Sequence, residues 1–190
     1  MKNGGLKYRK NGTGYVSVVS PKNARLKLLE FGAINIPRGE RIALPCARRE
    51  LLVLLLSGRC IAEVEGEKHP LGPRNDIFSD LPWAFYVRGL PQVSITARSK
   101  VEAVVSAAPA SSKKPFARLI PPEEVVERHV GADTYLRRVR TVIGEDFPAE
   151  RLLAGETLNE AGKWSSYPPH RHEKDAPPHE AKLEEVYYYR

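Results

Sequence analysis

The sequence predicts an all-β protein, built as an antiparallel sandwich or barrel of the jelly-roll kind. Short apolar and β-branched segments recur along the chain, with Gly, Pro and Asn turn signals about every eight to twelve residues. No stretch shows a helical hydrophobic period that could compete with this pattern. Closely spaced strands of this kind are typical of sandwiches and barrels.

The elements of the first half follow one another closely. Residues 1–14 are rich in Gly, Asn and Lys, and we expect a flexible basic N-terminus there. Glycine-containing turns at 36–40, 57–58 and 65–67 separate strands. The expected strands are 15–19, 25–35, 41–44, 49–56, 59–64, 68–71, 76–78, 84–87, 92–97 and 101–106.

A change of composition divides the chain. Residues 107–115 contain Pro, Ala, Ser and Lys, which is typical of a linker, and we place a linker at 107–122 between a first domain (15–106) and a second (123–190). A helical turn is expected to begin at 121–125, with strands at 135–143 and 151–158. Because the sequence ends within a further β-rich run, we expect the second domain to be truncated.

Composition limits the class of protein. The net charge is +7, and seven basic residues precede Glu30, the first acidic one. This basic arm contains no nucleic-acid-binding motif, so we expect a solvated terminus and no nucleic-acid partner. The longest apolar run, 51–56, is too short to cross a bilayer, and no signal segment opens the chain. Cys46 and Cys60 lack metal-site spacing, so we expect reduced thiols in a cytoplasmic protein without a membrane partner.

The strongest chemical pattern lies near the C-terminus. His170 and His172 are two residues apart in a proline-flanked segment, and side chains at this spacing share a face when the backbone is extended. The carboxylate of Glu185 follows after a polar loop. Two imidazoles and a carboxylate suit zinc, manganese or iron and leave positions open for water or substrate. The alternative is a pair of solvent-exposed loop histidines.

Alternation also orders the last residues. In a strand, Glu185, Tyr187 and Tyr189 would share one face, and Glu184, Val186 and Tyr188 would share the other. If Glu185 points into a cavity, Tyr187 and Tyr189 line it too and become candidates for substrate binding. The alternative is that these tyrosines are core aromatic residues with their hydroxyls at the rim.

Four segments together give the sequence a family resemblance. They lie at 116–120, 145–153, 164–172 and 183–189, and read FARLI, EDFPAERLL, WSSYPPHRH and LEEVYYY. The sequence resembles the 5-deoxy-glucuronate isomerase family of myo-inositol catabolism, which is related to the 4-deoxy-threo-hexosulose-uronate isomerases. The likeness covers nearly the whole chain and is strongest over 116–190.

The resemblance implies a bicupin, with an N-terminal cupin that has no metal ligands and a metal-binding C-terminal cupin. At the place of the first motif this chain has 45–50, where Glu50 is at most a remnant of a ligand. In the second cupin the family pattern falls on His170, His172 and Glu185. A fourth ligand, a histidine, is expected downstream of residue 190. The implied cofactor is a divalent metal, with zinc or manganese preferred.

The implied reaction converts the aldehyde 5-deoxy-glucuronate to the ketose 5-dehydro-2-deoxy-gluconate. The small-molecule partner is then a uronate-type sugar acid, and an arginine could hold its carboxylate in a bidentate pair. We assign this role to Arg138, with surface charge or ion pairing between domains as the alternative for the arginines of 137–140. The catalytic acid–base group is not assigned, and a homo-oligomer is an open possibility. Two other functions stay open: a catalytically incomplete fragment, and a metal-dependent cupin dioxygenase.

Overall fold

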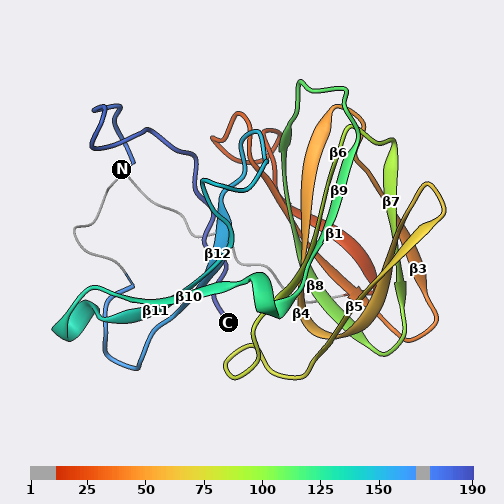
Figure 1. Cartoon of the computed structure of the whole chain (residues 1–190), viewed down its shortest axis with the longest axis horizontal. Coiled ribbons are helices and arrows are strands. Elements are labelled where there is room, and N and C mark those ends of the chain that lie inside the picture. Colours follow the sequence, from red (N-terminus) through yellow and green to blue (C-terminus); the bar gives the residue numbers. More distant parts are fainter. Residues whose placement is uncertain (1–11, 166–171) are drawn as a thin grey trace.

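The computed structural model describes residues 12–165 and 172–190, and the described part of the chain is all-β, as predicted. Figure 1 shows a large β-sandwich on one side and a small sheet beside it. The sandwich comprises β1 (Gly14–Val19), β2 (Glu30–Ile36), β3 (Arg41–Pro45), β4 (Arg49–Val64), β5 (Glu67–Arg74), β6 (Trp83–Arg88), β7 (Gln92–Ala97), β8 (Val101–Pro109) and β9 (Phe116–Ile120).

The long strand β4 belongs to both faces of this sandwich. Its first half pairs with β6 and β8, in the face ordered β1-β2-β8-β4-β6-β9, and its second half pairs with β5 and β7. The change of partners occurs at irregular pairing around Ser57 and Gly58. Gly58 has φ +97°, and a Cβ there would lie 2.1 Å from the carbonyl oxygen of Lys100. Only glycine fits this bend, where β4 passes from one face to the other.

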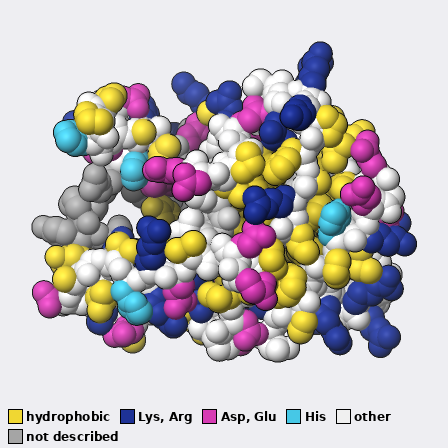
Figure 2. All heavy atoms as spheres, viewed as in Figure 1, with side chains coloured by type: hydrophobic (Ala, Val, Ile, Leu, Met, Phe, Trp, Pro, Cys, Tyr) yellow, Lys and Arg dark blue, Asp and Glu magenta, His cyan; other side chains and the backbone are white. Residues whose placement is uncertain are grey.

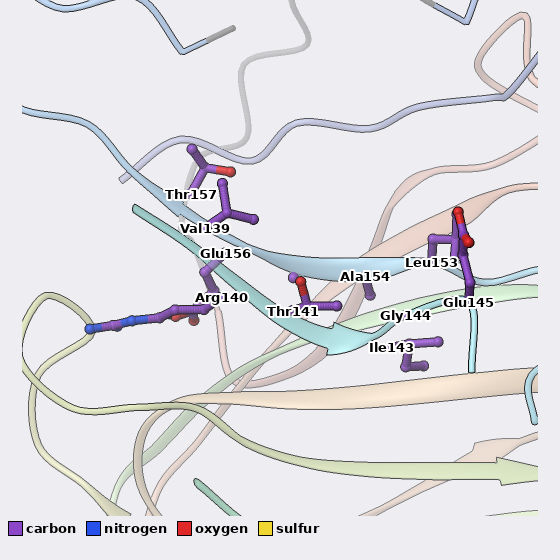
Figure 3. Close-up of a pocket in the computed structure, with 11 residues that line it drawn as sticks. Val139, Arg140, Thr141, Ile143, Gly144, Glu145, Leu153, Ala154, Glu156 and Thr157 are labelled. Carbon is purple, nitrogen blue, oxygen red and sulfur yellow. The ribbon is translucent and has the colours of Figure 1, made fainter. Parts of the chain in front are cut away.

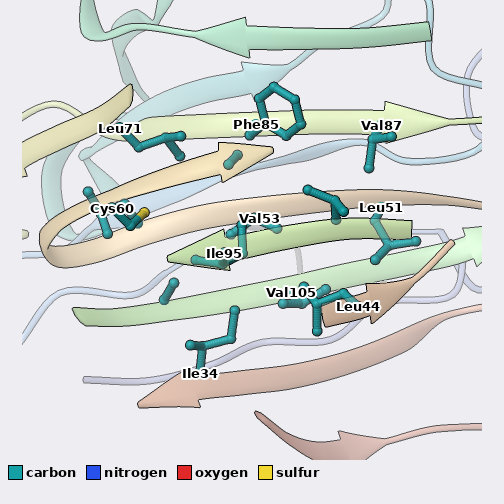
Figure 4. Close-up of a cluster of buried hydrophobic side chains, with 14 of the residues drawn as sticks. Ile34, Leu44, Leu51, Val53, Cys60, Leu71, Phe85, Val87, Ile95 and Val105 are labelled. Carbon is teal, nitrogen blue, oxygen red and sulfur yellow. The ribbon is translucent and has the colours of Figure 1, made fainter. Parts of the chain in front are cut away.

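Alternate side chains of β4 enter two different cores. Leu51, Val53 and Leu55 point into the sandwich, whose interior is filled by apolar side chains (Figure 4). Leu52, Leu54 and Leu56 point out of the opposite side of the same face and belong to a second core. Burial on both sides explains the unbroken apolar run, because a strand covered on one side alternates apolar with polar residues.

The second core joins the sandwich to a three-stranded antiparallel sheet of β10 (Val126–Val130), β11 (Arg137–Ile143) and β12 (Ala154–Leu158). Val142, Ile143 and Leu152 pack there against the outer face of the sandwich. Two single-turn 3-10 helices, Pro122–Glu124 and Asp133–Tyr135, flank β10. In 12–165 and 172–190 there is no helix that is long and apolar enough to span a membrane.

Five expectations about elements need correction. The strands expected at 49–56 and 59–64 are one strand, the strand expected at 25–35 begins only at Glu30, and 76–78 is part of a turn. The segment 107–122, expected to be a linker, contains the end of β8 and the whole of β9, which pairs with β6. Residues 183–190, expected to be a strand, form none.

Charge on the surface is mixed. On the face seen in Figure 2, Lys and Arg side chains lie in several places, some of them together at the lower right, with acidic and apolar side chains between the groups. Lys22, Arg25 and Lys27, which belong to the described part of the basic arm, lie at its surface.

Candidate metal and substrate site

The segment 183–190 presents different side chains to the protein and to solvent. Val186 and Tyr188 are partly buried in the second core, and the Tyr188 ring lies 5.6 Å from that of Phe31. Glu185, Tyr187 and Tyr189 are turned outward, and the two tyrosines are exposed to 64% and 77%. The two sets that the sequence separates by alternation therefore point in different directions here, although the segment is not a strand.

Glu184 belongs to the set that faces the protein. Its carboxylate accepts hydrogen bonds from the backbone N–H groups of Lys27 at 2.7 Å, Leu28 at 2.8 Å and Leu29 at 3.0 Å. Although partial desolvation opposes ionisation, these amide hydrogen bonds lower the pKa of the Glu184 carboxyl. Glu184 is thus held by the first sandwich as an anion.

The outward-facing residues form a small polar and aromatic cluster. The Tyr187 hydroxyl donates to the Glu185 carboxylate at 3.3 Å, and the rings of Tyr187 and Tyr189 stack with centroids 6.5 Å apart. Partial desolvation and the negative charge of Glu185 raise the pKa of the Tyr187 hydroxyl, against a smaller opposing effect of Arg137. Glu185 is exposed, and among the described residues its carboxylate accepts a hydrogen bond from the Tyr187 hydroxyl alone.

His172 is oriented by the loop that follows it. Its Nδ1 lies 3.0 Å from the carbonyl oxygen of Ala181, and its backbone N–H donates to the Glu180 carboxylate. A carbonyl oxygen only accepts, so Nδ1 is the donor in this contact and Nε2 is the ring nitrogen left to face a metal. Metal-binding histidines are commonly held by this kind of contact. His170 lies outside the described residues.

The donor set fits a divalent metal by its chemistry. His172 offers an imidazole nitrogen and Glu185 an exposed carboxylate, which together with a second imidazole from His170 would match zinc or manganese. Among residues 12–165 and 172–190 alone, no group of three His, Cys, Asp or Glu side chains is placed to hold a metal ion. The set of His170, His172 and Glu185 therefore stays a prediction.

The arginines of β11 lie on opposite faces, as their spacing requires. The Arg138 side chain is 42% exposed, and its guanidinium lies 3.8 Å from the Glu127 carboxylate. Arg140, on the same face, is buried. Arg137 donates to two backbone carbonyls, and its charge acts on Tyr187. The charge of Arg137 therefore bears on Tyr187 of the outward-facing cluster, while substrate binding by Arg138 stays a prediction.

Two hollows adjoin this region. One, of about 560 Å³, lies between the outer face of the sandwich, β12 and 183–190, and Leu52, Leu54 and Phe31 line it on the sandwich side. The other, of about 370 Å³, lies on β11 and β12 (Figure 3). There Val139 and Thr157 point to one side of the sheet, and Arg140 points away from them.

Comparison with known proteins identifies the family. The sequence pattern of the KduI/IolB family matches residues 5–190. The chain belongs to the KduI/IolB family. It is 35% identical over 182 residues to a 5-deoxy-glucuronate isomerase of Geobacillus kaustophilus, a match that covers 95% of this chain and 66% of that protein. It is 30% identical over 181 residues to a protein of the same name from Halalkalibacterium halodurans, covering 94% of this chain and 67% of the relative.

A solved structure extends the family likeness to the fold. The crystal structure of an IolB-like protein from Salmonella typhimurium LT2 matches with a TM-score of 0.81 and 28% identity, over 91% of this chain and 66% of the other. This KduI/IolB family chain therefore spans about two thirds of the length of the relatives that it matches.

The connection between the two sheets of this family member was hardly predictable from its sequence. Glu50, expected to be at most a remnant of a ligand, lies on the side of β4 that faces away from the sandwich interior, and it is fully buried. It accepts hydrogen bonds from the Tyr86 hydroxyl at 2.5 Å and from the N–H groups of residues 150–152 at 2.8, 2.7 and 2.9 Å. The sequence gives one indication of this placement: side chains alternate along a strand, so Glu50 must point to the other face of β4 from its neighbour Leu51.

A buried ionic cluster makes the second connection. Arg74 of β5 donates to both oxygens of Glu156 at 2.7 Å, and Arg140 donates to Glu127 at 2.7 Å and to Glu156 at 3.5 Å. Both guanidinium groups are buried and also donate to carbonyl oxygens in 77–80. The cross-strand pairing of Arg140 with Glu127 and Glu156 could be predicted once the strands were aligned, but the contact with Arg74 could not.

Proposed function

We propose that this chain carries the metal-binding part of an aldose–ketose isomerase that converts 5-deoxy-glucuronate to 5-dehydro-2-deoxy-gluconate in myo-inositol catabolism. The observation that carries the proposal is the 35% identity to a 5-deoxy-glucuronate isomerase along 182 residues. Because those residues cover 66% of the relative, the activity of the whole protein is part of the proposal.

The proposed organisation is a bicupin. Its first cupin, 15–106, holds no metal, which agrees with an interior filled by apolar side chains. Its second cupin begins in 123–190 and carries the ligands His170, His172 and Glu185. The exposed Glu185 carboxylate and the contact of His172 Nδ1 with the Ala181 carbonyl oxygen support this assignment. When bound there, zinc or manganese would act as a Lewis acid on the carbonyl and neighbouring hydroxyl of the sugar.

The chain's own residues would bind and orient the sugar acid. The stacked rings of Tyr187 and Tyr189 offer an apolar surface with hydroxyl donors beside Glu185. Isomerisation moves a proton between neighbouring carbons, which requires a group that takes and returns it. Neither thiol suits this step, because burial raises the pKa of Cys46 to about 11 and that of Cys60 to about 12. Two buried free thiols agree with the proposed cytoplasmic location.

The test combines metal binding with turnover. The metal-stripped protein is titrated with Zn²⁺ or Mn²⁺, and the loaded protein is then incubated with 5-deoxy-glucuronate while the aldehyde and ketose signals are followed by NMR. Loss of one of three ligands should weaken metal binding by about 100-fold or more. We therefore expect His172→Ala and Glu185→Gln to abolish both binding and turnover.

The matched control is His129→Ala, since His129 is exposed on β10. Turnover that survives His172→Ala at wild-type rate would refute the site. Oxygen uptake in place of isomerisation would favour a dioxygenase, and metal binding without turnover would mean that this length of chain is catalytically incomplete.

A further inference from the structure

Two adjacent glutamates at the C-terminal segment have different surroundings. Glu184 is partly buried and accepts three consecutive backbone N–H groups from 27–29, at 2.7 to 3.0 Å. Glu185 faces outward and accepts only the Tyr187 hydroxyl among the hydrogen bonds of the described residues. The family resemblance concerns the outward-facing residue, and nothing in it assigns a part to Glu184.

The contact of Glu184 decides which way its neighbours point. Three donors in a row recognise a carboxylate well, because an anion accepts short, strong hydrogen bonds from converging amides. With the Glu184 side chain turned toward 27–29, Glu185 on the next residue must turn away. The packing of Val186 and Tyr188 into the second core continues the same alternation.

The opposite arrangement, with Glu185 toward the protein and Glu184 toward solvent, would be less stable. A shift of one residue would bring Glu185 to the amides of 27–29 and move Tyr187 and Tyr189 toward the apolar side chains around Phe31. Glu184 would then point outward in place of Glu185. Either glutamate could accept the amides of 27–29, so the carboxylate contact and the packing act together. Only the arrangement with Glu184 at these amides also places Val186, and not the larger Tyr187, in the second core.

We propose that Glu184 is a positioning residue of the metal site. Through its contact with the amides of 27–29 it fixes which side of 183–190 is turned to the protein, and thereby it presents Glu185 to the metal. This inference rests on the proposed function, since it takes Glu185 to be a ligand. It gives the metal-free first sandwich a part in the site, because the loop that holds Glu184 immediately precedes β2 (Glu30–Ile36).

The experiment compares Glu184→Gln with Glu185→Gln, two neighbouring substitutions that remove the same charge. A glutamine keeps one acceptor oxygen and turns an NH2 group toward the remaining amides, so Glu184→Gln should break the contact. Three measurements are made on each variant: the Zn²⁺ dissociation constant, amide hydrogen exchange of 27–29, and nitration of residues 187–189 located by mass spectrometry.

For wild type we expect nitration of Tyr187 and Tyr189, with Tyr188 protected by its packing on Phe31. Glu184→Gln should speed exchange at 27–29, expose Tyr188 to nitration and raise the Zn²⁺ dissociation constant about 10-fold, at the lower end of the effect of losing a contact that orients a ligand. Glu185→Gln should abolish Zn²⁺ binding and leave exchange and the nitration pattern as in wild type. Glu184→Asp, which keeps the charge, should recover part of the Zn²⁺ affinity.

The three measurements test the positioning role of Glu184 and the metal site separately. A Glu184→Gln protein with wild-type Zn²⁺ affinity would overturn the positioning role, even if exchange at 27–29 increased. Unchanged exchange and nitration in that variant would overturn the contact itself. If wild type bound no Zn²⁺ but Glu184→Gln still exposed Tyr188, the proposed metal site would fail while the control of facing by Glu184 would stand.

Discussion

The carboxylate of Glu50 accepts the backbone N–H of Glu150 at 2.8 Å, across a separation of 100 residues. Glu150 in turn accepts hydrogen bonds from the backbone N–H of Ser111 at 2.8 Å and from that of Ser112 at 3.0 Å. Two carboxylates thus connect β4, the loop between β11 and β12, and the short segment between β8 and β9. The residues that follow this junction lead through β12 toward the proposed ligands.

Removing the buried acceptor should separate the two sheets. We expect Glu50→Ala to lower the free energy of unfolding by about 3 kcal/mol or more, because three backbone N–H groups and the Tyr86 hydroxyl lose their acceptor. Urea denaturation measures the loss, and hydrogen exchange should show it first at 150–158. Glu63→Gln, in the same strand but in a surface ion pair with Arg41, is the control and should change little. Equal effects of the two substitutions would contradict the assignment.

Loss of the Glu156 carboxylate, which Arg74 and Arg140 share, should strongly lower the stability of the protein. Glu156→Gln leaves the buried guanidinium groups of Arg74 and Arg140 without their common carboxylate, and we expect a loss of about 3 to 5 kcal/mol. Thermal or urea unfolding provides the measurement. The comparison is Glu160→Gln, which breaks the exposed pair with Lys163 and should leave stability nearly unchanged. Stability unaltered by Glu156→Gln would mean that the cluster is dispensable.

Much of this architecture could be predicted, and what failed has a common cause. Local patterns located most strands and the 3-10 turn at 122–124, because alternation and turn residues are properties of short segments. The same patterns could not tell that 49–56 and 59–64 are one strand, since Ser57-Gly58 looks like a turn unless the partner strands are known. The contacts of Glu50 and Glu184 join residues 100 or more positions apart, and spacing carries no information at that range.

The bend in β4 should tolerate no side chain. Gly58→Ala places a Cβ about 2.1 Å from the Lys100 carbonyl oxygen at a φ of +97°, so both a clash and backbone strain result. We expect a loss of about 3 kcal/mol or more, or failure to fold. Gly66→Ala separates the two effects, since Gly66 also has a positive φ, of +86°, but has open space around it. It should cost about 1 kcal/mol, and a Gly58→Ala protein as stable as this control would refute the close approach.

Stability should fall in acid through Glu150. Hydrogen bonds from the backbone and hydroxyl of Ser111 lower the pKa of this carboxyl below its ordinary value of 4.5. A lowered pKa in the folded state means that the folded protein binds the proton less readily than the unfolded chain. The contribution is therefore complete above pH 4.5 and is lost as the pH falls through the folded-state value.

Urea midpoints measured from about pH 6 to about pH 3 give the test. Glu150→Gln should show a shallower decline than wild type over this range, because it has no carboxyl to protonate. Parallel curves would show that Glu150 contributes nothing to the acid sensitivity.

The division of β4 between two cores has a consequence for how the chain reaches its native pairing. Sliding this strand by one position against β6 and β8 would exchange the side chains of the two cores. The Glu50 carboxylate would then be buried among aliphatic groups, away from the backbone amides that hydrogen-bond to it. An apolar run such as 51–56 is by itself nearly indifferent to such a slip. Because Glu50 stands at the start of this run, a misaligned strand would be strongly destabilised. Glu50 therefore fixes the register of β4 and also connects the two sheets.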